Sequence, residues 1–221
     1  MDSFIDHLTL NPNHGFCFVN DGSTDDTLKI LRSIEEKCKN AFVLDIKING
    51  GKANAVYQGI RYSLGNISSG FYGYMDADLA TPLSFVEVME TQLKTHGDIV
   101  MLFGSRQLAE PFAIERKAFR HFSGRLVARL ITWALGVQFG DTQCGAKIFT
   151  KEGVEIGFEK PFTSTWIFDI EIIKRILLLK GKSVIKEIPV NQWKDVGNSK
   201  VSPGYFFKMM GELVKVKRIK K

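Results

Sequence analysis

Short apolar runs of strand length alternate along the chain with segments of helical periodicity. The apolar runs lie near residues 15–19, 41–46, 70–75, 98–103 and 183–190. The helical patterns lie near residues 24–38, 52–64, 83–95, 116–135 and 168–180. This alternation predicts an α/β fold, in which a mostly parallel sheet has helices on both faces.

Two carboxylates end one of the apolar runs, in the segment Phe71-Tyr72-Gly73-Tyr74-Met75-Asp76-Ala77-Asp78. The predicted strand delivers Asp76 and Asp78 to the carboxyl edge of the sheet, where open α/β folds bind ligands. Mg²⁺ is usually held by one or two carboxylates, with water and phosphate oxygens completing its coordination sphere. An isolated Asp-x-Asp is more often a solvated turn, so the pair needs support from other motifs.

A second strand-like run, Phe16-Cys17-Phe18-Val19, leads into the polar segment Asn20-Asp21-Gly22-Ser23-Thr24-Asp25-Asp26-Thr27. We predict a tight turn at Gly22, a helix N-cap at Ser23 or Thr24, and acids in the first helical turn. Helix capping does not explain Asp21, which ends the strand. A lone acceptor at that position can bind a base or a ribose hydroxyl.

A third motif, Asn49-Gly50-Gly51-Lys52, precedes a helical pattern. Adjacent glycines allow close backbone approach, and Lys52 adds positive charge beside exposed backbone N–H groups, an arrangement that suits a diphosphate. The motif is neither a Walker A loop nor a G-x-G-x-x-G fingerprint, which argues against kinases and dinucleotide-dependent dehydrogenases.

The second half of the chain adds further motifs. They are Gly104-Ser105-Arg106, Gly140-Asp141-Thr142-Gln143-Cys144-Gly145-Ala146-Lys147, Trp166-Ile167-Phe168-Asp169-Ile170-Glu171, Glu187-Ile188-Pro189-Val190 and Gly197-Asn198-Ser199-Lys200-Val201. Together with the first three motifs, these resemble family 2 glycosyltransferases of the GT-A fold. The resemblance runs from about Asp21 to Val201 and is greatest to the dolichyl-phosphate β-glucosyltransferase branch of the polyprenyl-phosphate sugar transferases.

The resemblance implies a GT-A, Rossmann-like fold and an inverting, metal-dependent hexosyltransferase. The implied donor is a nucleotide diphosphate sugar, with UDP-glucose favoured, and the implied acceptor is a polyprenyl or dolichyl phosphate. A phosphate monoester has a second pKa of about 6 and is mostly ionised at neutral pH, so this acceptor needs no general base.

The resemblance also implies roles for residues around the nucleotide sugar. Asp76 and Asp78 would hold Mg²⁺ or Mn²⁺, although mannosyltransferase relatives often have glutamine where this chain has Ala80. Lys52 would assist at the diphosphate, and Asp21 would read the base. The residues implied in nucleotide-sugar binding are Asp21, Ser23, Gly51, Lys52, Asp76, Ala77 and Asp78.

A second group of residues is implied around the acceptor. Arg106 and Arg120 would bind the acceptor phosphate, with Arg116 as a substitute for Arg120; the alternative for Arg106 is a salt bridge at a strand end. The loop around sugar and acceptor would include Asp141, Gln143, Trp166 and Asp169. The residues implied in catalysis are Asp76, Asp78, Arg106 and Asp169, the last as a base if the acceptor were a hydroxyl.

Two other functions stay open from the sequence. The same fold could transfer sugar to a saccharide or small-molecule hydroxyl, which would need a carboxylate base. The chain could also be a non-catalytic fragment that binds a nucleotide sugar. The start of the chain suggests the second: relatives open with a strand and a Pro-Tyr-Asn-Glu-like loop, whereas residues 1–8 read as the helix that follows. We therefore expect the first family strand to be missing from this chain.

The positive charge of the protein lies in its C-terminal tail. The net charge is +6, from 30 basic and 24 acidic residues. Residues 200–221 hold seven Lys or Arg and one acid, which leaves 23 of each sign elsewhere. We predict a GT-A domain over residues 1–202 and a basic amphipathic helix over residues 203–221. Such a helix binds an anionic membrane surface or packs its apolar side on the domain.

Residues 123–135 form a second amphipathic candidate, which covers either the core or a bilayer interface. The sequence has no apolar stretch of membrane-spanning length, and three widely spaced cysteines fit a reducing compartment. We therefore expect a cytoplasmic protein, peripheral at the cytoplasmic membrane face. No motif supports nucleic-acid binding, and the oligomeric state stays open, a homo-oligomer included.

Overall fold

A computed structural model describes residues 2–110, 114–115, 121–194 and 203–220. The chain forms two compact units, Met1–Ser69 and Gly70–Lys221. The C-terminal tail belongs to the second unit.

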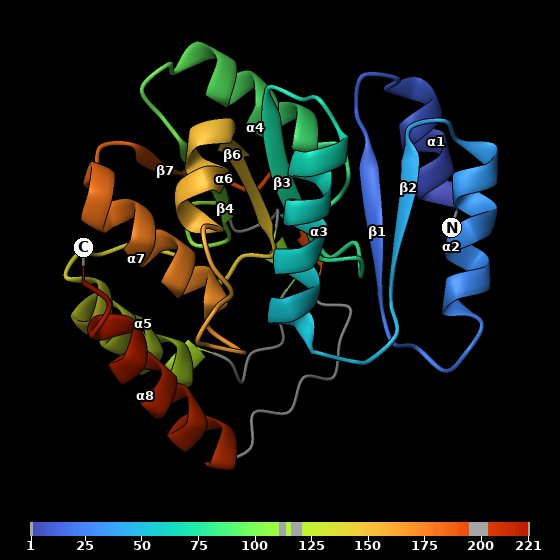
Figure 1. Ribbon diagram of the computed structural model, residues 1–221. Helices are drawn as coiled ribbons and strands as arrows, with labels where there is room; N and C mark the ends of the chain where they lie inside the picture. The colour runs from blue at the N-terminus through green and yellow to red at the C-terminus, as the bar shows by residue number, and fades with distance from the viewer. Residues whose placement is uncertain (1, 111–113, 116–120, 195–202, 221) are drawn as a thin grey trace. The chain divides into compact units, whose positions relative to one another are not determined.

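The first unit contains a two-stranded parallel sheet and three helices (Figure 1). Its elements are α1 (Asp2–Leu10), β1 (Phe16–Asp21), α2 (Thr27–Lys37), β2 (Ala41–Ile46) and α3 (Lys52–Asn66). The register runs from Phe16 opposite Ala41 to Asp21 opposite Ile46. Asp21 therefore lies at the carboxyl end of its strand, as predicted.

Helices cover both faces of the β1–β2 pair. On one face, Leu8 of α1 and Ile34 of α2 are buried and pack with Phe16. On the other, Gly59 of α3 comes so close to β1 that an added Cβ would lie 2.7 Å from Val19 Cγ2. The absence of a side chain at Gly59 thus allows α3 to pack directly on the strand.

The second unit is built on a four-stranded sheet of order β3-β6-β4-β7, with a separate parallel pair, β5 and β8. Its strands are β3 (Phe71–Met75), β4 (Met101–Ser105), β5 (Ile114–Glu115), β6 (Ala146–Thr150), β7 (Ile185–Pro189) and β8 (Trp193–Lys194). Its helices are α4 (Phe85–Thr95), α5 (His121–Leu135), α6 (Lys151–Gly157), α7 (Phe168–Lys180) and α8 (Pro203–Lys217).

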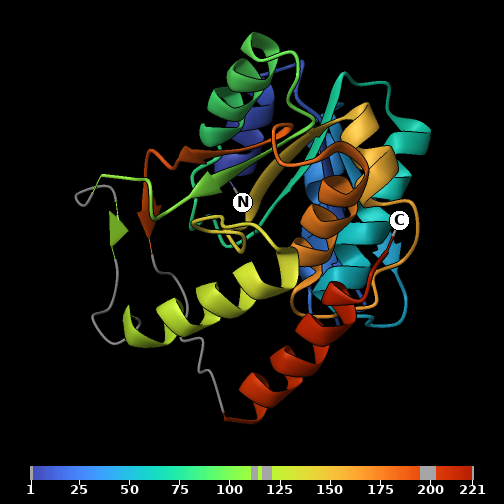
Figure 2. The same ribbon diagram turned by 90° about the vertical axis from the view of Figure 1, so that its left-hand side faces the viewer.

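Side chains of the four-stranded sheet alternate between two covered faces, as their two-residue period requires. Leu102 and Ile148 pack toward α4, in a cluster with Phe85. Phe149 points to the opposite face, where its ring meets Phe158 edge to face at 5.5 Å. Helix α4 therefore covers one face and α6 and α7 the other (Figure 2), which confirms the predicted α/β layering.

Strand β6 is the exception to the predicted parallel order. It is antiparallel to both of its neighbours, β3 and β4, whereas β4 and β7 are parallel. The sequence analysis did not predict it, because Lys147 interrupts its apolar pattern. That lysine is fully buried, so a charged residue occupies a core position of the central strand.

The predicted start of the helix after the first polar turn is wrong. Helix α2 begins at Thr27 and has Asp26 as its N-cap, not Ser23 or Thr24. Asp25 Oδ1 accepts hydrogen bonds from the N–H and the hydroxyl of Thr27 at 3.0 and 2.6 Å. The acids therefore precede the helix rather than lying in its first turn.

Helix α8 packs its apolar side within the second unit, beside α5 (Figure 2). Met209, Leu213 and Val216 are buried. The carboxylate of Glu212 accepts hydrogen bonds from the N–H groups of residues 165, 166 and 167 and from the Thr165 hydroxyl, at 2.7–3.3 Å. The apolar side of the tail therefore packs on the domain, which is one of the two alternatives predicted for it.

In the portion of the chain that the structure describes, every helix is too short or too polar to cross a bilayer.

Glu212 should stabilise the second unit in its ionised form. Burial would raise the pKa of this carboxyl, but the hydrogen bonds from residues 165–167 outweigh that effect and lower it. We expect Glu212→Gln to reduce the free energy of unfolding at pH 7 by about 1–3 kcal/mol. The stability difference between the wild type and the variant should be fully present above about pH 4.3, the pKa of a glutamate in the unfolded chain. It should shrink as the pH falls through the lower pKa that Glu212 has in the folded protein.

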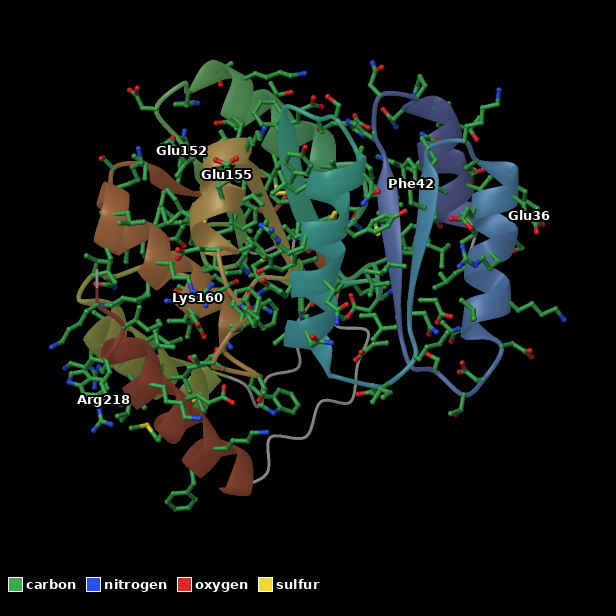
Figure 3. All side chains as sticks on the ribbon, viewed as in Figure 1. Glu36, Phe42, Glu152, Glu155, Lys160 and Arg218 are labelled. Atoms are coloured by element: carbon green, nitrogen blue, oxygen red, sulfur yellow. The ribbon has the colours of Figure 1, made fainter. Side chains whose placement is uncertain are left out.

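Denaturant unfolding at several pH values measures this effect. Glu155→Gln, which removes an exposed carboxylate on α6 (Figure 3), is the control and should change stability little. A Glu212→Gln deficit that is the same at pH 3 and pH 7 would contradict the prediction.

Candidate functional site

The predicted nucleotide-binding loops of the first unit are joined by Asp21. Its carboxylate accepts hydrogen bonds from the N–H groups of Gly50 at 2.9 Å and Gly51 at 2.7 Å. The turn after Asp21 needs glycine, because Gly22 has a φ of +66° and an added Cβ would lie 2.6 Å from Asn49 N. The N–H groups of Gly50 and Gly51 therefore donate to Asp21, a contact that was not predicted from the sequence.

Lys52 and Ser23 lie close in sequence to the contact between Asp21 and the two glycines. Lys52 is exposed at the first residue of α3. Ser23 is exposed, and its N–H donates to Asn20 Oδ1 at 3.3 Å. Asn20 in turn donates to Asp45 Oδ1 at 2.7 Å. Neither Asn20 nor Asp45 was predicted to have a role. Their positions near the carboxyl ends of the adjacent strands β1 and β2 could have indicated the contact.

In the second unit, Asp76 and Asp78 form a turn directly after β3. The Asp76 N–H donates to Gly145 O at 2.9 Å, and the Asp76 carboxylate lies against Gly145 so closely that a Cβ there would collide with it. Asp78 is exposed, as is Ala77, and Asp78 Oδ1 accepts from the Ala80 N–H at 3.0 Å.

The backbone of this acidic turn is strained. Leu79 has a φ of +55°, and among the described residues no other non-glycine residue has a positive φ. An αL conformation is unfavourable for a leucine, and such strain is concentrated at functional sites. The turn is held from its far side, where the Lys194 N–H donates to Ala80 O at 2.9 Å.

The donor set of the acidic turn fits Mg²⁺ or Mn²⁺. Both cations prefer carboxylate, phosphate and water oxygens. Within the described residues, no group of three or more His, Cys, Asp and Glu side chains forms a metal site. A cation at Asp76 and Asp78 would therefore take further oxygens from water and a bound phosphate.

Arg106 and Asp141 form a bidentate ion pair. Arg106 Nε donates to Asp141 Oδ2 at 2.6 Å and Nη2 donates to Oδ1 at 2.7 Å. Burial alone would lower the pKa of Arg106 and raise that of Asp141, but their mutual hydrogen bonds and charges outweigh it in both cases. The salt bridge considered for Arg106 is thus present, and it uses two of the five guanidinium N–H donors.

Glu187 on β7 fixes the loop that carries Asp141. Its carboxylate accepts from the N–H of Gly140 at 2.8 Å and of Asp141 at 3.0 Å. Glu187 was not predicted to have a role, although an acid inside an apolar strand was a usable signal. Gln143, in the same loop, is half-buried.

Asp169 is held in a buried network rather than exposed to a site. It is 6% exposed, and its Oδ1 accepts from the Tyr74 hydroxyl and from Lys147 Nζ, both at 2.5 Å. Burial, together with the charge and hydrogen bond of Asp169, raises the pKa of Tyr74 well above its usual value, so the phenol stays protonated. The sequence analysis gave Lys147 and Tyr74 no role.

Two predicted acceptor residues, Arg116 and Arg120, lie outside the described residues. Trp166 is described and is 53% exposed, with Lys208 Nζ of α8 located 5.7 Å from its ring centroid. The structure therefore brings together Arg106 with Asp141, and Asp76 with Gly145, but does not describe the full predicted acceptor site.

Comparisons with known proteins agree with these motifs. The family model of glycosyl transferase family 2 matches residues 2–146. Dolichyl-phosphate beta-glucosyltransferases of Trichomonas vaginalis and Saccharomyces cerevisiae are 32% and 30% identical to the chain over 202 and 199 residues, or 90% and 83% of its length. The chain spans 58% of the length of each of these relatives.

A solved structure has the same fold. Glucosyl-3-phosphoglycerate synthase from Mycobacterium tuberculosis, in complex with Mn²⁺, UDP-glucose and phosphoglyceric acid, aligns with a TM-score of 0.69 and 15% identity. The alignment covers 100% of this chain and 75% of that one. The likeness shows the α/β fold of GT-A glycosyltransferases.

The contact between Asp76 and Gly145 should control cation binding. In Gly145→Ala, the new methyl group would displace the Asp76 carboxylate, so we expect the affinity for Mn²⁺ to fall by at least about tenfold, the lower end of the cost of disturbing a ligand's support. Electron paramagnetic resonance of free Mn²⁺ measures the affinity. Gly97→Ala is the matched control, because its Cβ would meet open space. Unchanged Mn²⁺ affinity in folded Gly145→Ala would refute this role.

Proposed function

The chain belongs to glycosyl transferase family 2, and from this premise we propose that it transfers glucose from UDP-glucose to a polyprenyl or dolichyl phosphate, with inversion at the anomeric carbon. The observation that carries the proposal is the strained acidic turn of Asp76 and Asp78 at the carboxyl end of β3. The names of the relatives support the lipid phosphate as acceptor.

The proposed reaction is a single displacement. An oxygen of the acceptor phosphate attacks the anomeric carbon, and the bond from that carbon to the diphosphate breaks, with its electron pair leaving on UDP. The acceptor oxygen is already ionised at neutral pH, so no proton has to be removed. The protein needs to align the two substrates and stabilise the charge on the departing diphosphate.

Acidic and basic side chains would stabilise the bound nucleotide sugar. Asp76 and Asp78 would hold Mg²⁺ or Mn²⁺, which supplies positive charge at the diphosphate; a solved structure of this fold contains Mn²⁺ and UDP-glucose. Lys52 would add a second positive charge. Asp21 would accept from the nucleotide while holding the glycine loop, with Ser23 and Gly51 beside it in the first unit, and Ala77 would lie with the two acids of the turn in the second.

Arg106 is our candidate for the acceptor phosphate. Its pair with Asp141 fixes the guanidinium plane and leaves three N–H donors for phosphate oxygens. Arg116 or Arg120 would add to it, and Asp141, Gln143 and Trp166 would shape the loop around the sugar.

The buried contacts of Asp169 favour a phosphate over a hydroxyl as the acceptor group. A general base must reach a substrate proton within hydrogen-bond distance. Asp169 is 6% exposed and already accepts from Tyr74 and Lys147, so it is placed for support rather than for proton transfer.

We further propose that the second unit rests on an anionic membrane surface through the basic side of α8. Lys217 Nζ lies 3.6 Å from the centroid of the half-exposed Trp133 ring, and Phe207 is 76% exposed. Arg218 directly follows the same helix (Figure 3). Aromatic and basic side chains together are typical of interfacial helices. The free cysteines support the cytoplasmic face.

A transfer assay tests the function. We expect the protein with Mn²⁺ to convert UDP-glucose and dolichyl phosphate to UDP and dolichyl phosphate glucose. EDTA should stop the reaction, and Asp78→Ala should slow it by at least about 100-fold, whereas Asp98→Ala, a change at an exposed acid outside the turn, should have little effect.

The other outcomes identify the competing functions. Glucosylation of free dolichol as fast as of its phosphate would favour a hydroxyl acceptor. Binding of UDP-glucose without transfer to any acceptor would favour a non-catalytic nucleotide-sugar-binding fragment.

The basic side of α8 should add electrostatic attraction to anionic vesicles. Because α8 is part of the core of the second unit, charge removal is preferable to truncation. Lys215→Gln, Lys217→Gln and Lys220→Gln together should weaken binding to vesicles containing phosphatidylserine by about 1 kcal/mol per lysine. The effect should decrease with salt, since the Debye length is about 8 Å at 0.15 M.

Vesicle co-sedimentation measures this binding. The matched control changes Lys29, Lys37 and Lys39, exposed residues of the first unit, to Gln. Equal losses in the two triple variants would show that net charge, and not the α8 surface, determines binding.

A further inference from the structure

Lys147 is a fully buried lysine at the centre of the second unit. It has 0% exposure and is the second residue of β6. Its Nζ lies 5.4 Å from the centroid of the Tyr74 ring and 5.9 Å from that of Phe103. A buried ammonium is costly unless it is paired and hydrogen-bonded, so its contacts indicate what it is for.

Two oxygens accept from Lys147. One is Asp169 Oδ1 at 2.5 Å, which neutralises the charge. The other is the backbone carbonyl of Cys144, also at 2.5 Å. Asp169 neutralises the charge, and the Cys144 carbonyl accepts a second of the three ammonium N–H donors, so that Lys147 also fixes the position of this carbonyl.

The Cys144 carbonyl belongs to the peptide unit that leads into Gly145. Gly145 O accepts the Asp76 N–H at 2.9 Å, and the Asp76 carboxylate lies against the Gly145 Cα. On its other side, the Cys144 N–H donates to Asp141 O at 3.1 Å. A chain of contacts thus runs from Lys147 through residues 144 and 145 to the first acid of the turn.

We propose that Lys147 is a positioning residue, which holds the Cys144–Gly145 peptide and thereby sets the place of the Asp76 carboxylate. The inference rests on the proposed function, because Asp76 matters as a ligand of the cation at the diphosphate. Asp169 and the Tyr74 hydroxyl serve to keep the buried ammonium neutralised and oriented.

The competing explanation is a structural ion pair, and it predicts a different pattern among three variants. Lys147→Met removes the ammonium and leaves Asp169 buried without its cation. Asp169→Asn removes the carboxylate and keeps the donor to Cys144 O. The double variant removes both charges, restoring charge balance, and leaves Cys144 O without its lysine donor.

Amide hydrogen exchange of the full chain, followed by nuclear magnetic resonance, distinguishes the two explanations. Under our proposal the Asp76 amide exchanges about tenfold faster in both variants that lack Lys147, as expected for loss of local support. It stays at the wild-type rate in Asp169→Asn. Amides of the β1–β2 ladder in the first unit serve as the internal reference.

Restoration of Asp76 protection in the double variant would overturn the proposal, because neutrality alone would then suffice. If Lys147→Met does not fold, the exchange rate of the Asp76 amide is compared between Asp169→Asn and the double variant alone. Mn²⁺ titrations in the presence of UDP add a functional readout, with weakened affinity expected in the double variant but not in Asp169→Asn. Failure of the wild-type protein to bind UDP-glucose would contradict the proposed function and leave the exchange result standing.

Discussion

In four loops of this protein, backbone N–H groups donate to side-chain carboxylates of neighbouring elements. A buried N–H without a partner is costly, and an ionised oxygen is the strongest acceptor a side chain offers. The pairs are Glu187 with residues 140–141, Glu171 with 163–164, Glu212 with 165–167 and Asp21 with 50–51. Glu187, Glu212 and Asp21 tie their loops to elements remote in sequence, and Glu171 ties its loop to the helix that follows, so these loops depend on the acids.

This pattern divides the acids of the protein into two kinds. Glu171 is fully buried and is also paired with Arg175 at 2.6 Å, so it serves the fold. Asp78 is exposed and bonds an N–H group two residues away, which leaves it open to solvent and ligands. Asp76 lies between these cases, since its amide is part of the sheet edge and its carboxylate rests on Gly145. The acids of the turn after β3 are therefore the ones that would hold the proposed cation.

The elements of the fold could be predicted from the sequence, but the partners of the site residues could not. Short apolar runs of strand length located β1, β2, β3, β4 and β7. The same pattern missed β6, because Lys147 interrupts its apolar residues. The residue that neutralises this lysine, Asp169, lies 22 positions further along the chain. The glycine loop and Asp21 were each singled out, but local patterns contain no information that the acid would accept the N–H groups of that loop. The N-cap was misplaced for the same reason, since Asn20 and Asp25 take the N–H groups that decide where α2 begins.

The reversed direction of β6 sets the spacing of charges in the second unit. Because β3 and β4 are both antiparallel to β6, they run in the same direction, so the acidic turn after β3 and Arg106 after β4 emerge at one edge of the sheet. They are separated there by two interstrand spacings, about 9.6 Å. Salt screens partly buried charges only weakly. A diphosphate at one position and a phosphate at the other would therefore share one edge of the sheet, and their mutual repulsion would have to be balanced by positive charge at that edge.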